Sequence, residues 1–213
     1  DETIAIVLLI IAVGTNLFCY TVLEPGMSHV YSFCLISAFL YYQHKFQNKP
    51  TFSSSLICGL LLGFISLIRL PNILVIIVPV LWNLTSFNRL RSKISFLVGN
   101  FKMILLMGSM IILVLFIQST YYKYVTGKWW YYAYGEEKFF FNNPQILQGL
   151  LGFRKGFFIY CPLMIFALAG IVISIKKKYS FALATLILFI THVYVIYSWW
   201  CWWYGGGLGA RTM

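Results

Sequence analysis

Acidic residues are scarce in this sequence: only 5 of its 213 residues are Asp or Glu, against 16 Lys and Arg. Charged residues of both signs make up 10% of the chain, whereas an average soluble domain carries about 25%. So few charged side chains cannot cover a water-facing surface. The composition therefore excludes a disordered chain and an ordinary cytosolic enzyme.

Cysteine is also sparse, and no two cysteines form a CxxC pair. The five cysteines are scattered, mostly inside apolar runs, at positions 19, 34, 58, 161 and 201. This spacing excludes a disulfide-stapled secreted module and gives no support to a zinc site. The chain has no sequence repeat either, so the inverted-repeat signature of many transporters is missing.

Apolar residues dominate instead: 61% of the chain is hydrophobic and its mean hydropathy is +0.82. A helix needs about 20 apolar residues to cross about 30 Å of hydrocarbon. The apolar runs predict an all-α, polytopic transmembrane helix bundle, with residues 1–213 forming one transmembrane domain. Seven spans are expected, at about 3–22, 27–43, 52–68, 71–87, 101–120, 157–175 and 179–199, with an outer loop at 121–156.

Basic residues orient this predicted bundle. A net charge of +11 suggests nucleic acid in a soluble protein, but in a membrane protein basic residues gather on the cytoplasmic side, so no nucleic-acid partner is expected. Nine of them fall in loops of one side: Lys45, Lys49, Arg89, Arg91, Lys93, Lys102 and Lys176 to Lys178. The first residue is therefore predicted to be cytoplasmic and the last extracytoplasmic. The sequence begins at Asp1, directly before an apolar run, and stops directly after a glycine-rich segment. We therefore expect it to be an internal piece of a longer protein.

Glu24 and His29 flank a tight turn at the predicted outer boundary of the membrane. A carboxylate and an imidazole at this spacing can share a proton or a metal ion. Both are therefore candidate catalytic residues and candidate ligands of a divalent metal. The alternative is a solvated turn in which Ser28 caps a helix and His29 lies in its first turn.

Four basic residues on the predicted outer side stand beside turns, helix starts or glycines. They are Arg69, Arg154, Lys155 and Arg211. An ionisable residue near the hydrocarbon is costly to keep, and a guanidinium can hold a phosphate through two parallel hydrogen bonds. The four are candidate phosphate-binding residues. The alternatives are snorkelling for Arg69 and ordinary flanking charges for the others.

Aromatic residues are dense in two predicted outer segments. Trp129 and Trp130 lie in the loop 121–156, and Trp202, Trp203 and Tyr204 follow the last span. Aromatic faces suit sugar rings and lipid tails, so these five are candidate sugar or lipid contacts. The alternative is an aromatic belt at the membrane boundary.

Four motifs together resemble a known family. They are Glu24-Pro25-Gly26-Met27-Ser28-His29 with its neighbours at 20–33, Leu67-Ile68-Arg69-Leu70-Pro71-Asn72, Phe153-Arg154-Lys155-Gly156 with Tyr160-Cys161-Pro162, and Trp202-Trp203-Tyr204-Gly205-Gly206-Gly207-Leu208-Gly209-Ala210-Arg211. They resemble bacterial multi-pass membrane glycosyltransferases of the GT-C type. The nearest groups are the dolichyl-phosphate-mannose protein mannosyltransferase-like and the lipid A aminoarabinose transferase-like proteins, as often seen in Bacteroidetes. The resemblance extends over nearly the whole chain.

The resemblance implies a GT-C-like fold in the bacterial inner membrane, in contact with membrane lipid. It implies transfer of a sugar from a polyprenyl-phosphate-linked donor to a glycan, lipid or protein acceptor at the extracytoplasmic face. The main catalytic acid is then expected upstream of Asp1, with Glu24 as a second acidic position, and the donor phosphate is assigned to Arg69, Arg154, Lys155 and Arg211. A divalent metal is the one cofactor left open. The alternatives are a transporter or flippase of a lipid-linked oligosaccharide, a polymerase or ligase of surface polysaccharide, and a structural membrane subunit.

Overall fold

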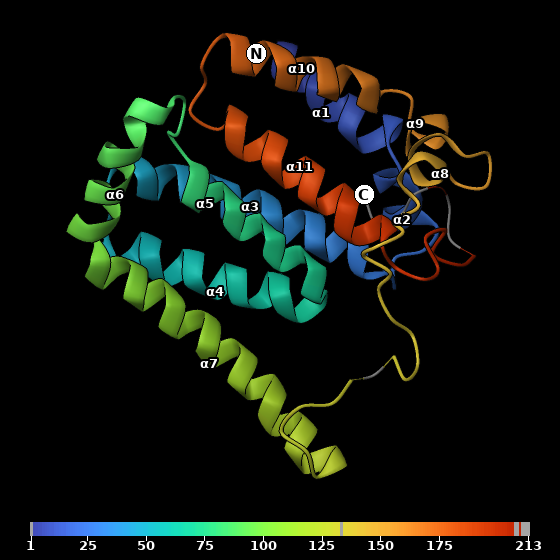
Figure 1. Ribbon diagram of the computed structural model, residues 1–213, viewed down its shortest axis with the longest axis horizontal. Coiled ribbons are helices and arrows are strands. Elements are labelled where there is room, and N and C mark those ends of the chain that lie inside the picture. Colours follow the sequence, from blue (N-terminus) through green and yellow to red (C-terminus); the bar gives the residue numbers. More distant parts are fainter. Residues whose placement is uncertain (1, 133, 207–208, 210–213) are drawn as a thin grey trace. The chain divides into compact units, whose positions relative to one another are not determined.

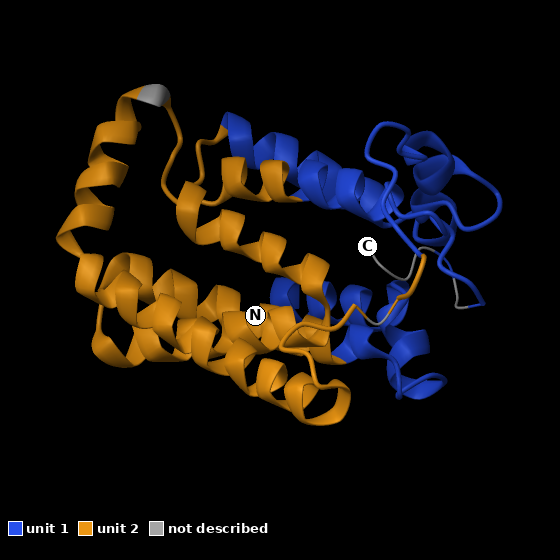
Figure 2. Ribbon diagram, turned by 60° about the horizontal axis from the view of Figure 1, so that its bottom comes forward, with its two compact units in different colours: residues 1–30, 137–176, 189–213 blue, residues 31–136, 177–188 orange. Residues whose placement is uncertain are grey.

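The computed structural model describes residues 2–132, 134–206 and 209, and these residues form helices joined by turns (Figure 1). The prediction of an all-helical chain is confirmed for this part of the sequence, where the one β pairing is an isolated bridge between Phe139 and Trp199. The chain divides into two compact units (Figure 2). Unit 1 comprises Asp1–Val30, Glu137–Lys176 and Phe189–Met213, and unit 2 comprises Tyr31–Glu136 and Lys177–Leu188.

Unit 2 contains most of α3 (Ser28–Asn48) and a continuous series of helices after it. These are α4 (Phe52–Ile68), η1 (Leu70–Ile76), α5 (Ile77–Leu81), η2 (Phe87–Arg89), α6 (Leu90–Gly99) and α7 (Phe101–Thr126), where η marks a 3₁₀ helix. Helix α4 begins in a capping box, in which Thr51 and Ser54 satisfy each other's backbone N–H groups. It ends at Arg69, whose backbone is extended, because Pro71 cannot continue an α-helix. The predicted helix break at Arg69 is confirmed.

Helix α4 packs closely against the first half of α7, and the second half of α7 runs away from it (Figure 1). The contact is made at two glycines of α4 that lie one turn apart. A Cβ atom on Gly59 would lie 2.7 Å from the backbone oxygen of Met107, and one on Gly63 would lie 2.8 Å from Cβ of Val114. This small-xxx-small pattern lets two helix backbones approach, as is common between helices in membranes.

The core of unit 2 lies between α3, α4 and α7. Its buried residues are Phe39, Phe46, Cys58, Leu62, Ile65, Val75 and Met107. Gln43 of α3 is also fully buried, at 0% exposure, and neither its Nε2 nor its Oε1 has a hydrogen-bond partner among the described residues. A buried polar group without a partner costs free energy, so Gln43 is a destabilising residue in this core.

Replacing Gln43 with methionine is expected to stabilise the chain. Methionine has nearly the same shape but no polar atoms to desolvate, and the gain should be about 1–3 kcal/mol in the free energy of unfolding. Thermal unfolding of the full-length protein in detergent measures it. Gln47→Met is the matched control one turn along α3: Gln47 donates a 3.4 Å hydrogen bond to the oxygen of Pro79, so its loss should not stabilise. Equal shifts for the two variants would contradict the prediction.

Lys93 of α6 is buried at 7% exposure, and its Nζ donates a 2.8 Å hydrogen bond to the backbone oxygen of Pro79. Pro79 lies in the short helix α5, whose last carbonyl groups have no partner within the helix. Lys93 therefore caps the end of α5. Burial lowers the pKa of Lys93 to about 8 from the ordinary value of 10.5.

Stability is expected to increase with pH because of Lys93. Between about pH 8 and 10.5 the unfolded chain keeps the lysine proton and the folded chain does not, so raising the pH favours folding across this window. At about 1.4 kcal/mol for each pKa unit, the gain is at most about 3 kcal/mol. From pH 7.5 to 10 the unfolding temperature of the wild type should increase relative to that of Lys93→Met. A parallel increase in both would refute this role.

Unit 1 contains α1 (Glu2–Gly14), α2 (Leu17–Val22), α8 (Ile146–Leu151), α9 (Phe157–Tyr160) and α10 (Met164–Lys176), and the end of α11 (Ala182–Tyr197). Two apolar runs predicted as continuous spans are interrupted here. The run 3–22 breaks after Gly14, where the Thr15 hydroxyl bonds the backbone on both sides, accepting from Leu17 N–H and donating to Ile11 O. The run 157–175 breaks at Pro162, which has no N–H to offer a helix.

Helix α7 is long and apolar enough to cross a membrane, with a mean hydropathy of 2.2 over its most apolar stretch. Only 11% of that stretch is buried within the chain, whereas the core helix of a soluble protein is mostly buried. Among the described helices it alone is both long enough and apolar enough, since α3 has 21 residues but is less apolar. Shorter apolar helices span Glu2–Gly14, Phe52–Ile68, Leu70–Leu81, Met164–Lys176 and Ala182–Tyr197. The seven-span topology therefore stays a prediction.

Candidate functional site

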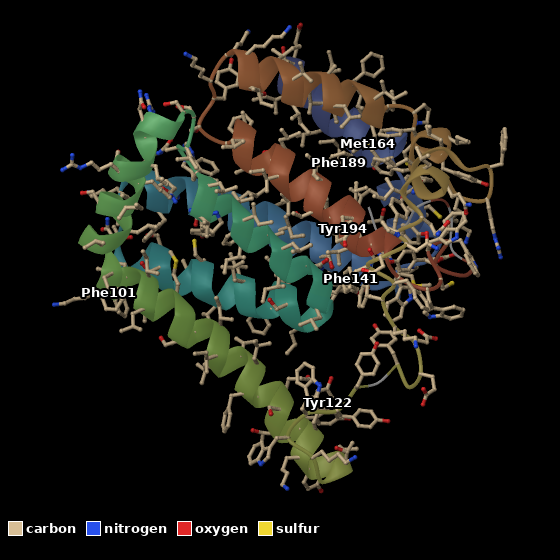
Figure 3. The ribbon with its side chains drawn as sticks, in the orientation of Figure 1. Phe101, Tyr122, Phe141, Met164, Phe189 and Tyr194 are labelled. Atoms are coloured by element: carbon tan, nitrogen blue, oxygen red, sulfur yellow. The ribbon has the colours of Figure 1, made fainter. Side chains whose placement is uncertain are left out.

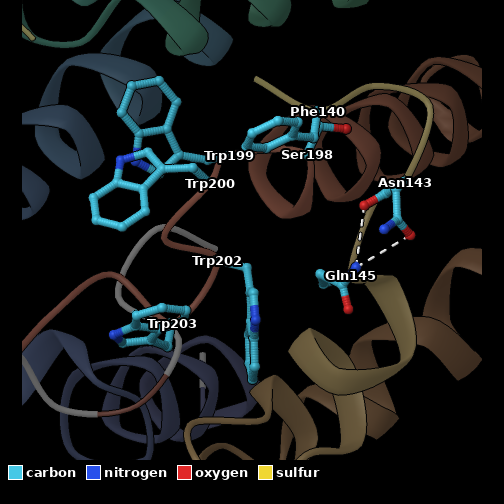
Figure 4. A pocket seen from close by; sticks show the side chains of 8 residues that line it. All are labelled: Phe140, Asn143, Gln145, Ser198, Trp199, Trp200, Trp202 and Trp203. Carbon is cyan, nitrogen blue, oxygen red and sulfur yellow. Dashed lines mark hydrogen bonds between the residues drawn. The ribbon is translucent and has the colours of Figure 1, made fainter. Parts of the chain in front are cut away.

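A cavity of about 230 Å³ lies in unit 1, beyond the end of α11 (Figure 4). Its wall consists of aromatic rings together with three polar side chains. The lining residues are Phe140, Asn143, Gln145, Ser198, Trp199, Trp200, Trp202 and Trp203. The cavity thus combines a largely aromatic wall with a few polar groups, which is the usual composition of a small-molecule site.

Backbone pairing brings two distant segments together to build this wall. The N–H of Phe140 donates to the oxygen of Ser198 at 2.6 Å, and the N–H of Trp200 donates to the oxygen of Lys138 at 3.2 Å. Side chains reinforce the pairing: the rings of Phe141 and Tyr194 stack (Figure 3), and the Tyr194 hydroxyl donates to the oxygen of Phe141 at 2.9 Å. The loop 138–145 is therefore fixed against the last turns of α11.

The segment after α11 folds back onto the helix that precedes it. The Tyr204 hydroxyl donates a 2.6 Å hydrogen bond to the backbone oxygen of Ile196, which lies in the last turn of α11. Trp202 and Tyr204 pack against a small core that α11 forms from Val193, Ile196 and Tyr197. This return places Trp202 and Trp203 in the cavity wall opposite Asn143 and Gln145 (Figure 4).

Two cations hold this returning segment from outside the cavity. The guanidinium carbon of Arg154 lies 4.0 Å from the ring centre of Trp203, a cation–π contact, and Lys155 Nζ donates a hydrogen bond to the backbone oxygen of Gly205. Lys155 has a φ of 152°, a conformation that side chains rarely adopt. Such backbone strain concentrates at functional sites. The structure thus brings together five predicted site residues, Arg154, Lys155, Trp202, Trp203 and Tyr204, of which Trp202 and Trp203 line the cavity.

Local sequence explains the tight turn that carries the two cations. A Cβ atom on Gly152 would lie 2.4 Å from the backbone oxygen of Gln148, and one on Gly156 would lie 2.6 Å from the backbone oxygen of Gly152. Only glycine fits at either position. Arg154 is exposed although its guanidinium lies against Trp203, so an anion can reach the guanidinium.

The predicted pair Glu24 and His29 lies at the turn between α2 and α3. His29 is in the first turn of α3, and its ring centre is 5.0 Å from that of Tyr20, which is buried. Glu24 Oε2 is buried and has no hydrogen-bond partner among the described residues. A buried carboxylate oxygen in this condition is available to accept a proton or to bind a cation.

The remaining predicted site residues lie elsewhere. Arg69 belongs to unit 2, at the end of α4. Trp129 and Trp130 follow α7 in the same unit, where Trp129 stacks on Phe116. None of these three lines the cavity, and Arg211 lies outside the described residues.

Six of the eight lining residues were not among the predicted site residues. They are Phe140, Asn143, Gln145, Ser198, Trp199 and Trp200. The polar run Asn142-Asn143-Pro144-Gln145 inside an aromatic loop is the signal that points to two of them. The Gln145 amide donates to the side-chain and backbone oxygens of Asn143, both at 3.2 Å, so these two side chains are already mutually oriented (Figure 4).

Within the described ranges, no group of three or more His, Cys, Asp or Glu side chains gathers in a way that would hold a metal ion. The comparisons with protein-family models, with curated proteins and with solved structures found no match to this chain. Its function is therefore argued from the geometry of the cavity and of the cations beside it.

Proposed function

We propose that this chain is part of a membrane glycosyltransferase that moves a sugar from a polyprenyl-phosphate-linked donor to a glycan, lipid or protein acceptor at the extracytoplasmic face. The observation that carries the proposal is the aromatic cavity with an arginine against its wall. Such a donor has a sugar ring, a phosphate and an apolar tail. Each part needs a different surface, and unit 1 offers candidates for the sugar ring and the phosphate.

The cavity supports binding of a sugar ring. Its volume of about 230 Å³ lies below the roughly 300–1,000 Å³ of sites for drug-sized ligands, so a compact ligand fits it. Tryptophan faces pack against the C–H faces of a sugar, while the amides of Asn143 and Gln145 can donate to and accept from hydroxyl groups. In this proposal Trp202 and Trp203 stack on the sugar and the two amides orient it.

Arg154 supports binding of the phosphate. Its exposed guanidinium, preorganised by stacking on Trp203, can form two parallel hydrogen bonds to a phosphate at the mouth of the sugar site. Positive charge at that place stabilises the phosphate as it leaves, which is the electrostatic contribution such a transfer needs. Glu24 is proposed as a base or an electrostatic partner of the positive charge that develops on the sugar. Arg69 and Arg211 stay secondary candidates for the phosphate.

The topology is part of the same proposal. The pairs α1–α2, η1–α5 and α9–α10 and the helices α3, α4, α7 and α11 are taken to cross the membrane, which gives seven crossings. The first residue is then cytoplasmic, and the end of α11 with the cavity beyond it lies at the extracytoplasmic boundary. The positive-inside arrangement of the basic loops supports this orientation.

The proposal is tested with purified full-length protein in liposomes that contain polyprenyl-phosphate sugars and candidate acceptors. Transfer of the sugar that is reduced by Trp202→Ala and by Trp203→Ala would support it. Correctly folded protein that transfers no sugar from any donor would overturn it. Movement of the donor across the bilayer without transfer would favour the flippase alternative instead.

A further inference from the structure

Helix α8 exposes an apolar face for which the described residues offer no cover. Leu147 and Leu151 lie one turn apart on this face and are 76% and 59% exposed, and Phe153, just after the helix, is 90% exposed. Side chains four residues apart on a helix point the same way, so Leu147 and Leu151 share one face, and the exposed Phe153 follows it in the chain. Large apolar side chains exposed together in this way mark an interaction surface.

The opposite face of α8 is fixed to the end of α11. Gly149 lies directly against Tyr197, since a Cβ atom there would be 2.1 Å from the ring. Ile146 and Leu150 pack against the cluster of Val193, Ile196 and Tyr197. Because Tyr197 is the last residue of α11, this contact places α8 beside the end of α11. If α11 crosses the membrane, as in the proposed function on which this inference rests, α8 lies at the outer boundary of the bilayer.

The basic and aromatic residues near the patch are of the kinds expected at a membrane boundary. Arg154 and Lys155 follow Phe153 directly, so an apolar face is bordered by two positive charges. Trp199 and Trp200 lie just beyond the end of α11, where interfacial tryptophans are expected. An apolar face next to basic side chains is the arrangement of segments that lie in the plane of a membrane surface and favour anionic lipids.

We propose that Ile146–Leu151 and the following Phe153 form an interfacial anchor that rests in the outer leaflet of the bilayer. Leu147, Leu151 and Phe153 lie among the upper acyl chains of phospholipids, and the charges of Arg154 and Lys155 attract anionic headgroups. The anchor holds the wall of the aromatic cavity at the membrane surface. The loop 121–156, as a whole on the extracytoplasmic side, is then immersed in lipid at this end.

The test uses the full-length protein in nanodiscs of phosphatidylcholine and phosphatidylglycerol that include a phospholipid with a diazirine in its acyl chain. After irradiation, mass spectrometry locates the labelled residues, and hydroxyl-radical oxidation of a parallel sample locates the water-exposed ones. Ile190, which is 55% exposed on α11, is the internal reference for lipid contact. Label is expected on Leu147, Leu151 and Phe153, within about threefold of Ile190, with little oxidation. The double variant Leu151→Asn/Phe153→Asn should reduce the label on α8 by at least about fivefold and leave Ile190 unchanged.

Each other outcome overturns the anchor in a recognisable way. Oxidation without label on α8 would place the patch in water. Neither label nor oxidation would mean that another segment of protein or a second copy covers it. In both cases label on Ile190 would leave the proposed membrane placement of α11 intact. Absence of label on Ile190 as well would overturn that placement and the anchor together.

Discussion

Replacing Gly59 with leucine is expected to separate α4 from α7 and to destabilise unit 2 by about 3 kcal/mol or more in the free energy of unfolding. The reason is that the obstacle is backbone: a Cβ atom at this position would lie 2.7 Å from the oxygen of Met107 and 2.9 Å from its Cα. A side-chain obstacle can rotate away, but a helix backbone moves only as a whole. Thermal unfolding of the full-length protein measures the loss.

Gly108 provides the matched control for this substitution. It lies on α7, but a Cβ atom there would meet no other atom within 4 Å. Gly108→Leu should therefore be neutral or slightly stabilising, since leucine favours a helix over glycine by up to about 1 kcal/mol. Gly63→Leu should also destabilise, because the nearest atom is Cβ of Val114, which side-chain rotation does not move. Equal unfolding temperatures for Gly59→Leu and Gly108→Leu would mean that the contact between Gly59 and Met107 does not limit the size of the side chain.

The helical character of the chain and one helix break were predictable from sequence because both are local. The low charge content favours apolar helices, and Pro71 ends α4 by a steric clash that no neighbour can remove. The break after Gly14 was not predicted, because it depends on the Thr15 hydroxyl competing for backbone hydrogen bonds inside a run that stays apolar on average. Hydropathy averages measure composition and do not detect such competition.

Of the residues that line the cavity, only two in the tryptophan segment after α11 were predicted from the sequence. Trp202 and Trp203 stand out because four tryptophans before glycines form an unusual pattern. Asn143 and Gln145 were missed because their role depends on the pairing of 138–145 with the end of α11, about 55 residues away in sequence. Gly149 belongs to the same class, since the sequence does not reveal that Tyr197 lies against it. Contacts between distant segments decide which polar loop residues face a cavity.

Replacing Arg154 with lysine is expected to reduce kcat/KM for a polyprenyl-phosphate sugar by about 10- to 100-fold while membrane insertion and folding stay unchanged. Lysine keeps the positive charge and can still approach Trp203, but a single ammonium cannot offer the two parallel donors of a guanidinium. The loss therefore measures the geometry of phosphate binding rather than charge. Steady-state transfer rates and donor affinity, measured on the same preparation, separate the two contributions.

Three further variants test whether the effect belongs to the site in unit 1. Trp203→Phe keeps an aromatic face under the guanidinium and should retain more activity than Trp203→Leu, which removes it. Arg69→Lys tests the second candidate for the donor phosphate, which belongs to unit 2. If Arg154→Lys and Arg69→Lys both bind the donor as tightly as the wild type, neither arginine holds the phosphate. If only Arg154→Lys is impaired, the phosphate is bound beside the aromatic cavity.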